Sequence, residues 1–103
     1  MRWKPIHKER NKTDDSVEAI NDRAFEGCAA LKEIRLPEKL TRIKEYTFFL
    51  CENLRTVKIP EGVTYIGKGA FEMTDLRKVR IPRSVVEIGK DAFPKDTKLI
   101  REE

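Results

Sequence analysis

The side chains of this sequence best suited to chemistry are two cysteines and one histidine. Cys28 and Cys51 are 23 residues apart, and His7 lies far from both in the N-terminal segment. A structural zinc ion takes four protein ligands, so these three side chains cannot complete its tetrahedron. No Cys-His or Ser-His-Asp arrangement is fixed by their spacing. The sequence predicts no metal site, no cofactor and no enzyme, and only a pocket with strongly perturbed titrating groups would revive a catalytic interpretation.

The 23-residue interval between the cysteines belongs to an internal repeat that spans most of the chain. An isoleucine recurs at intervals of 23, 23 and 22 residues, at Ile20, Ile43, Ile66 and Ile88. A phenylalanine follows each of them five positions later, at Phe25, Phe48, Phe71 and Phe93. A leucine recurs further on, at Leu31, Leu54, Leu76 and Leu99. Such a period is typical of a solenoid, in which stacked coils join their apolar faces into one continuous core.

Each repeat contains a short predicted strand that ends at a proline. The segment 34–37 (Ile-Arg-Leu-Pro) alternates apolar and polar residues as a strand does, and its proline cannot donate a hydrogen bond to a following ladder. We expect a second, briefer strand in segments such as 63–66, and a single helical turn at residues 67–71. The third repeat is one residue short between Phe71 and Leu76.

The repeat pattern Ile-x-x-x-Ala-Phe-x-x-Cys-x-x-Leu-x-x-Ile-x-Leu-Pro resembles the BspA-like, or Treponema pallidum-type, leucine-rich repeats, and residues 17–100 match it. This resemblance implies a mostly β leucine-rich-repeat solenoid, wound as a right-handed superhelix with one parallel sheet on the concave face and single helical turns or loops on the convex side. It also implies a role in adhesion or protein binding, and it carries no catalytic residues.

The chain divides into two predicted parts. Residues 1–16 do not fit the repeat and form either a cap, in which Trp3 or Ile6 covers the first coil, or a flexible arm. Residues 17–103 form the repeat domain, with repeats at 20–42, 43–65 and 66–87 and a partial repeat at 88–103. No apolar run approaches the length of a membrane span, and no secretory signal is visible. The protein therefore either stays inside the cell or is a piece of a longer one, for which the resemblance suggests the cell surface or secretion.

The equivalent positions of Cys28 and Cys51 place them on neighbouring coils, with strand-like separation of about 5 Å. That distance permits a disulfide. We favour the alternative of two buried thiols that act as small hydrophobic groups, because the position faces the core of the repeat.

The outward positions of the predicted strands are mostly basic, although the chain has a net charge of only +4 from 22 basic and 18 acidic residues. One column comprises Lys32, Arg55, Arg77 and Lys98, and a second comprises Arg35, Lys58 and Arg80, with Lys78 between them. The functional interpretation is a basic strip that binds an acidic protein or an anionic glycan; the alternative is a solvated strand face. Nucleic acid is disfavoured because the strip has no aromatic side chain for base stacking.

A second candidate surface is apolar. Phe49, Leu50 and Met73 follow the conserved phenylalanines in the second and third repeats, near Tyr46. They could form an exposed patch that marks a protein contact, or they could simply pack locally over the core. The sequence thus predicts a monomeric or weakly dimeric binding module, with a structural unit that self-assembles through its ends or this patch as the alternative function.

Overall fold

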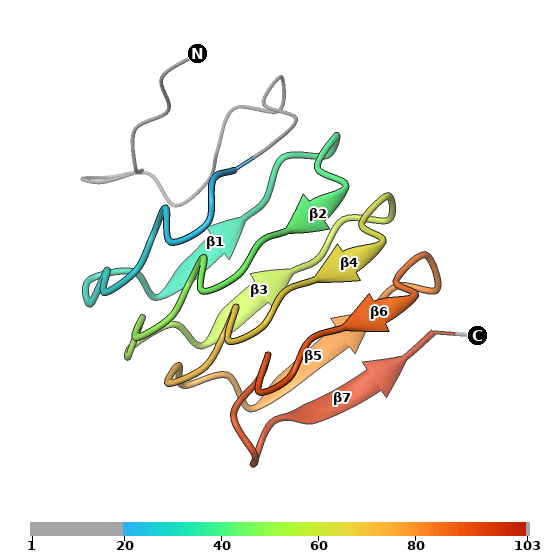
Figure 1. Ribbon diagram of the computed structural model, residues 1–103. Coiled ribbons are helices and arrows are strands. Elements are labelled where there is room, and N and C mark those ends of the chain that lie inside the picture. The colour runs from blue at the N-terminus through green and yellow to red at the C-terminus, as the bar shows by residue number, and fades with distance from the viewer. Residues whose placement is uncertain (1–19, 103) are drawn as a thin grey trace.

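The computed structural model describes residues 20–102, which contain seven short strands and no helix (Figure 1). In chain order the strands are β1 (Glu33–Arg35), β2 (Arg42–Ile43), β3 (Thr56–Lys58), β4 (Tyr65–Ile66), β5 (Lys78–Ile81), β6 (Glu87–Ile88) and β7 (Lys98–Arg101). The predicted brief second strand is confirmed by β4 and by its equivalents β2 and β6.

The strands form two parallel rows whose arrows run in opposite directions in Figure 1. One row contains β1, β3, β5 and β7, which we call the long-strand row; the other is the three-stranded sheet β2–β4–β6. Along the chain the strands alternate between the rows, so that four belong to the long-strand row and three to the other. Residues one repeat apart are paired in register, as Ile34 with Val57 and Ile43 with Ile66 show.

The core lies between these two rows and extends through successive coils as a single cluster. Ile43 of β2 and Ile66 of β4 face the core from one side, and Ile34, Val57 and Val79 face it from the other. Along one edge the phenylalanines stack as predicted: the ring centroids of Phe25 and Phe48 are 4.9 Å apart, and those of Phe48 and Phe71 are 5.1 Å apart. The column continues to Phe93, whose ring centroid is 5.2 Å from that of Phe71. The stacked-coil geometry inferred from the repeat is therefore confirmed.

The helical turn predicted at residues 67–71 does not form, and tight turns take its place. The reason is visible in the hydrogen bonds. Alternate amides of this segment donate to other coils: Gly67 N to Ile43 O of the preceding coil at 2.7 Å, and Gly69 N to Lys90 O at 3.1 Å and Phe71 N to Ala92 O at 2.7 Å in the next coil. An α-helix would direct those amides to its own carbonyls, so the bonding between coils excludes it.

The long-strand row departs from one continuous ladder. β1 pairs with β3, and β5 pairs with β7, whereas β3 lies beside β5 without regular strand pairing. The cause is the shortening of the third repeat: nine residues separate Phe48 from Val57, but only eight separate Phe71 from Val79. The phenylalanines remain stacked, so the missing residue shifts the start of β5 relative to β3. The backbone groups of these two strands are therefore out of register for regular pairing.

The last coil is shorter still, and the predicted equivalence of Leu99 with Leu76 is wrong. Only six residues separate Phe93 from Leu99, and Leu99 lies opposite Val79 in the β5–β7 pair. The leucine therefore occupies the strand position of the repeat. It is also 41% exposed, because within the described residues no further coil covers it.

Candidate functional site

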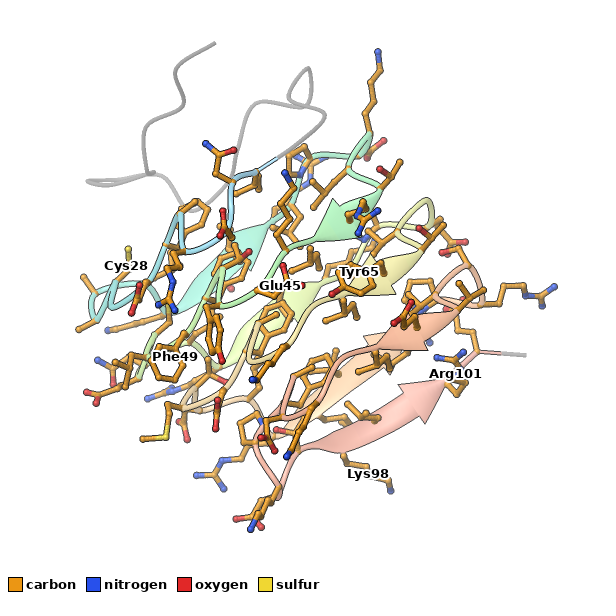
Figure 2. All side chains as sticks on the ribbon, in the orientation of Figure 1. Cys28, Glu45, Phe49, Tyr65, Lys98 and Arg101 are labelled. Atoms are coloured by element: carbon orange, nitrogen blue, oxygen red, sulfur yellow. The ribbon has the colours of Figure 1, made fainter. Side chains whose placement is uncertain are left out.

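The long-strand row carries the basic surface that the sequence predicts. All eight predicted side chains are exposed, and we call this set the basic strip: Lys32, Arg35, Arg55, Lys58, Arg77, Lys78, Arg80 and Lys98. Arg35 and Lys58 point outward from their strands because the residues before them, Ile34 and Val57, point into the core. Figure 2 shows the Lys98 side chain extending from β7 into solvent.

The strand register agrees with one pair of the predicted columns and corrects the placement of Lys98. Arg35 is paired with Lys58 across β1 and β3, as expected. Lys98, however, lies opposite Lys78 rather than in the column of Arg77. The shortened last coil causes this shift, since it brings Lys98 to the strand three residues earlier than in the second repeat.

The arginines and lysines of the strip differ in their neighbours. Each arginine forms an ion pair with a carboxylate, and each of these pairs is exposed enough to contribute at most about 1 kcal/mol. The four pairs are Arg35–Glu38 at 3.4 Å, Arg55–Asp75 at 3.8 Å, Arg77–Asp75 at 3.3 Å and Arg80–Glu102 at 3.4 Å. Among residues 20–102, the strip lysines have no such ion pair. The lysine ammonium groups are therefore the cations most available to a partner.

Sequence reasoning missed the role of Asp75 in this surface. Its carboxylate lies between Arg55 and Arg77, which belong to neighbouring coils, and pairs with both. The amide of Asp75 donates to the carbonyl of Leu54 at 3.0 Å, which holds the residue at the junction of the two coils. The aspartate offsets the repulsion between the stacked arginines. The repeat alignment places Asp75 in the shortened loop. Its ion pairs with the two arginines depend on side-chain rotamers, which the alignment does not specify.

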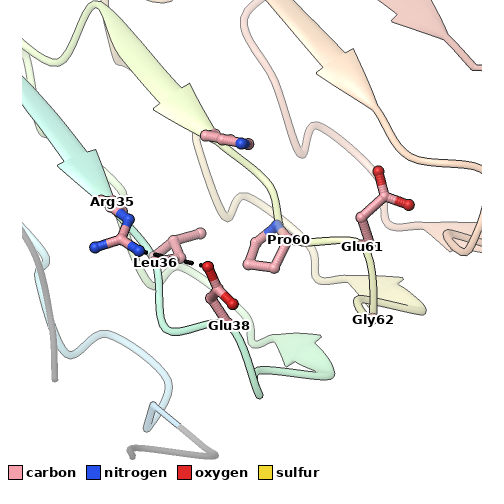
Figure 3. Close-up of a pocket in the computed structure, with 7 residues that line it drawn as sticks. Arg35, Leu36, Glu38, Pro60, Glu61 and Gly62 are labelled. Carbon is pink, nitrogen blue, oxygen red and sulfur yellow. Dashed lines mark hydrogen bonds and ion pairs between the residues drawn. The ribbon is translucent and has the colours of Figure 1, made fainter. Parts of the chain in front are cut away.

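A pocket opens beyond the carboxyl ends of β1 and β3, with a volume of about 210 Å³ (Figure 3). We call it the strand-end pocket. Arg35 and Lys58 line its strand side, and Glu38 and Glu61 line its turn side. The remaining lining residues are Leu36, Pro60 and Gly62. A second hollow of about 250 Å³ on the outer surface of β1 and β3 also includes Arg35 and Lys58. These two cations therefore stand at the junction of both hollows.

The two cysteines are free thiols rather than a disulfide. Cys51 is fully buried, as expected, and its S–H donates to the carbonyl of Phe25 at 3.1 Å. Burial raises the pKa of Cys51 to about 12. Cys28 is half-buried rather than buried, and partial burial raises the pKa of its thiol too. Raised pKa values keep both thiols protonated at neutral pH, so neither side chain is an activated nucleophile.

The β2–β4–β6 side contains a hydrogen bond that sequence reasoning did not anticipate. The Tyr65 hydroxyl donates to the Glu45 carboxylate at 2.6 Å, and the Arg42 guanidinium lies 4.7 Å from the centre of the Tyr65 ring (Figure 2). The hydrogen bond lowers the pKa of Glu45 and raises the pKa of Tyr65. The hydrogen bond joins two coils. It favours the charged form of the Glu45 carboxylate and the neutral form of the Tyr65 hydroxyl, so it does not create a reactive group.

The predicted apolar patch lies on the turns that follow Phe48 and Phe71. Met73 is 54% exposed, while Phe49 and Leu50 are half-buried. Phe49 packs edge-on against Tyr46 with ring centroids 5.4 Å apart. Local packing against Tyr46 thus accounts for part of the burial of Phe49. Met73 is the most accessible member of the patch.

Several other predictions concern chemistry or segments away from these surfaces. Residues 20–102 contain no cluster of three or more His, Cys, Asp or Glu side chains arranged to hold a metal ion. That same part of the chain has no helix with the length and apolarity needed to cross a bilayer. The predicted cap or arm at residues 1–16, including Trp3, Ile6 and His7, lies outside the described residues.

The fold and surface define a class of protein: a mostly β repeat solenoid, built from coils of about 23 residues, whose charged strand face lies over an apolar core. A sequence model of the BspA type leucine rich repeat region matches residues 9–100, with six copies. The chain belongs to the BspA-type leucine-rich repeat family. Leucine-rich repeat proteins generally mediate protein–protein interactions.

Two solved structures share this architecture. A leucine-rich repeat protein from Bacteroides ovatus ATCC 8483 is 30% identical with a TM-score of 0.82, and the match covers 88% of this chain and 24% of that one. The Treponema pallidum leucine-rich repeat protein TpLRR is 24% identical with a TM-score of 0.62, over 84% of this chain and 46% of its own. This chain therefore spans about a quarter and just under half of their lengths. No protein with a curated function matches it.

Proposed function

We propose that this protein is a recognition module that binds an acidic protein segment through the basic strip. The observation that carries the proposal is the pairing of Arg35 with Lys58 on adjacent strands, where both side chains line the strand-end pocket and the neighbouring hollow. A carboxylate that enters between them would meet two cations at once. Hydrogen bonds between charged groups are stronger than those between neutral groups.

The strand-end pocket favours a protein partner over a uniformly charged glycan. Glu38 and Glu61 line its turn side and repel a chain that is negative along its whole length. Leu36 and Pro60 provide apolar contact for a side chain that accompanies the carboxylate. A peptide segment can offer acidic, apolar and basic groups in sequence, and so can match this mixture of surfaces.

The test is a binding titration with an acidic glutamate-rich peptide at low and moderate salt, with heparin as the glycan probe. We expect salt to weaken peptide binding, because the contacts are exposed ion pairs. Reversing the charges of Arg35 and Lys58 together to glutamate should weaken it about tenfold or more. Tighter binding of heparin than of the peptide, with the same sensitivity to this double variant, would assign the strip to glycans instead.

A matched control separates a local site from the effect of net charge. Lys68 and Lys90 are exposed and lie outside the strip, so reversing both to glutamate changes the net charge by the same amount. The peptide should bind this control variant nearly as well as the unmodified protein. Equal loss of binding in both double variants would contradict a defined binding surface.

A further inference from the structure

The turns of the solenoid contain left-handed backbone at two recurring positions. The first is occupied by Arg23, Tyr46, Gly69 and Asp91. The second is occupied by Gly27, Leu50 and Met73, with φ angles of 74°, 64° and 64°. Glycine adopts this conformation without steric penalty, whereas a residue with a Cβ atom is strained there.

Leucine and methionine are conformationally strained at the second position, where Leu50 and Met73 stand. Gly27 shows that the coil forms with no side chain there. Met73 is 54% exposed, so burial does little to offset its backbone strain, and Leu50 is only half-buried. Two neighbouring coils therefore keep strained backbone to present large apolar side chains at the surface. Strain that packing does not explain is concentrated at functional sites in proteins.

The two side chains occupy equivalent places on adjacent coils. The amide of Leu50 donates to the carbonyl of Glu72 at 3.0 Å, which sets the coil of Leu50 directly against the coil of Met73. Phe49 adjoins them in sequence and is braced by its edge-on contact with Tyr46. We call Phe49, Leu50 and Met73 the turn patch; Figure 2 labels Phe49, which lies at the turn edge of the molecule.

The sequence neighbours of the turn patch are acidic. Glu52 lies two residues after Leu50 and is exposed, and Glu72 directly precedes Met73. Within residues 20–102, neither carboxylate forms an ion pair. The patch thus adjoins, in sequence, two carboxylates that form no ion pair in this part of the chain. Its charge is opposite to that of the basic strip.

We propose that the turn patch is a second interaction surface, which binds a partner segment whose apolar side chains are flanked by lysine or arginine. The apolar side chains of the partner pack on Leu50 and Met73, and its cations pair with Glu52 and Glu72. A second copy of this chain is the poorer occupant. Pairing about a two-fold axis would set the patch against itself and bring like carboxylates together.

The experiment measures binding of a short amphipathic peptide of leucine and lysine, with a peptide of leucine and glutamate as its counterpart. The unmodified protein should bind the lysine peptide through the turn patch. Met73→Gly should weaken this binding about tenfold, which is a typical loss for one apolar anchor. The same substitution should leave the melting temperature unchanged or raise it, because glycine relieves the left-handed strain.

Asp91→Gly is the matched control. Asp91 is an exposed residue with left-handed backbone in another coil, so its replacement relieves the same kind of strain without touching the patch. It should raise the melting temperature and leave peptide binding unchanged. Reversing Arg35 and Lys58 should also leave binding of the lysine peptide intact, which separates this surface from the basic strip.

Three results would overturn the proposal. If Met73→Gly lowered the melting temperature but still bound the lysine peptide fully, the Met73 side chain would serve only to pack the fold. Equal affinity for the leucine–glutamate peptide would remove the role of Glu52 and Glu72. Light scattering that shows a dimer of the unmodified protein, lost in Met73→Gly, would assign the patch to self-assembly instead.

Discussion

The aromatic rings of Phe48 and Phe71 lie parallel, with centroids 5.1 Å apart and planes inclined by 6°. The two residues are 23 positions apart and fill the same place in consecutive coils. Their contact shows directly that one repeat of sequence becomes one turn of the solenoid. Both rings are fully buried, so the column joins the coils through apolar burial as well as ring stacking.

Replacing Phe48 by alanine should destabilise the protein by about 3–5 kcal/mol, because it leaves a cavity between Phe25 and Phe71. Phe93→Ala should cost less, since Phe93 is half-buried and stacks on one described ring only. Chemical denaturation followed by circular dichroism measures both free energies of unfolding. An equal or larger loss for Phe93→Ala would show that the column does not stabilise the coils as described.

Gly67→Ala should destabilise the protein by about 1–3 kcal/mol, as overpacking of a tight contact does. An added Cβ atom would lie 2.7 Å from the backbone nitrogen of Glu45 in the preceding coil, and backbone cannot move aside cheaply. Gly62→Ala is the control, because its Cβ atom would meet only the Leu40 carbonyl oxygen at an ordinary 3.7 Å. Thermal melting of the two variants should separate them clearly; similar melting temperatures would argue against the close approach of the coils.

Cys28 should react with a maleimide reagent before Cys51 does. Burial raises the pKa of both thiols, but Cys51 is inaccessible and its pKa is about 12, so it has almost no thiolate at neutral pH. Mass spectrometry of the native protein should therefore find one label, and denaturant should expose the second site. Cys28→Ser removes the early label and serves as the control. Rapid double labelling of the native protein would be inconsistent with the buried position of Cys51.

The pKa of Glu45 should rise toward its ordinary value of 4.5 in the variant Tyr65→Phe, which removes the hydroxyl donor. A lowered pKa in the folded state stabilises the protein above the ordinary pKa. That stability is lost as pH falls through the folded-state value. The variant should accordingly lose less stability on acidification than the unmodified protein does.

Carbon-detected NMR titration of the Glu45 carboxyl group measures this shift. Tyr46→Phe is the control, since Glu45 bonds to Tyr65 and no bond from Tyr46 contributes to its lowered pKa. An unchanged Glu45 titration in Tyr65→Phe would mean that the backbone hydrogen bond to the carboxylate, with Arg42 and Lys44, holds it in its charged form without the hydroxyl.

The sequence predicts the stacking of the coils well because four equivalent phenylalanines and four equivalent isoleucines leave only one way to build a shared core. It predicts the register less well wherever a coil loses residues. The alignment places Leu99 with Leu76, yet the strand pairs it with Val79, because loop residues rather than core residues are lost in the last coil. The predicted helical turn fails for a related reason, since hydrogen bonds between coils take the amides that a helix would use.

The candidate site is only partly predictable from sequence. The exposure of Arg35, Lys58, Lys78 and Arg80 follows from strand alternation, because Ile34, Val57 and Val79 beside them are buried. The exposure of Lys98 does not follow from it, because all four residues of β7 are exposed. The distribution of its ion pairs is not encoded in that pattern. Asp75 comes from a loop and Glu102 from the end of the last coil, and each reaches its arginine only through the three-dimensional stacking of the repeats.

The location of binding on the basic strip is the central functional claim, and chemical-shift mapping tests it most directly. The backbone amide resonances of the ¹⁵N-labelled protein are followed during titration with the glutamate-rich peptide. We predict that the largest changes fall in β1 and β3 around Arg35 and Lys58, extend to β5, and shrink when salt is added. Changes confined to the β2–β4–β6 sheet, or changes in β1 and β3 that are indifferent to salt, would contradict the account.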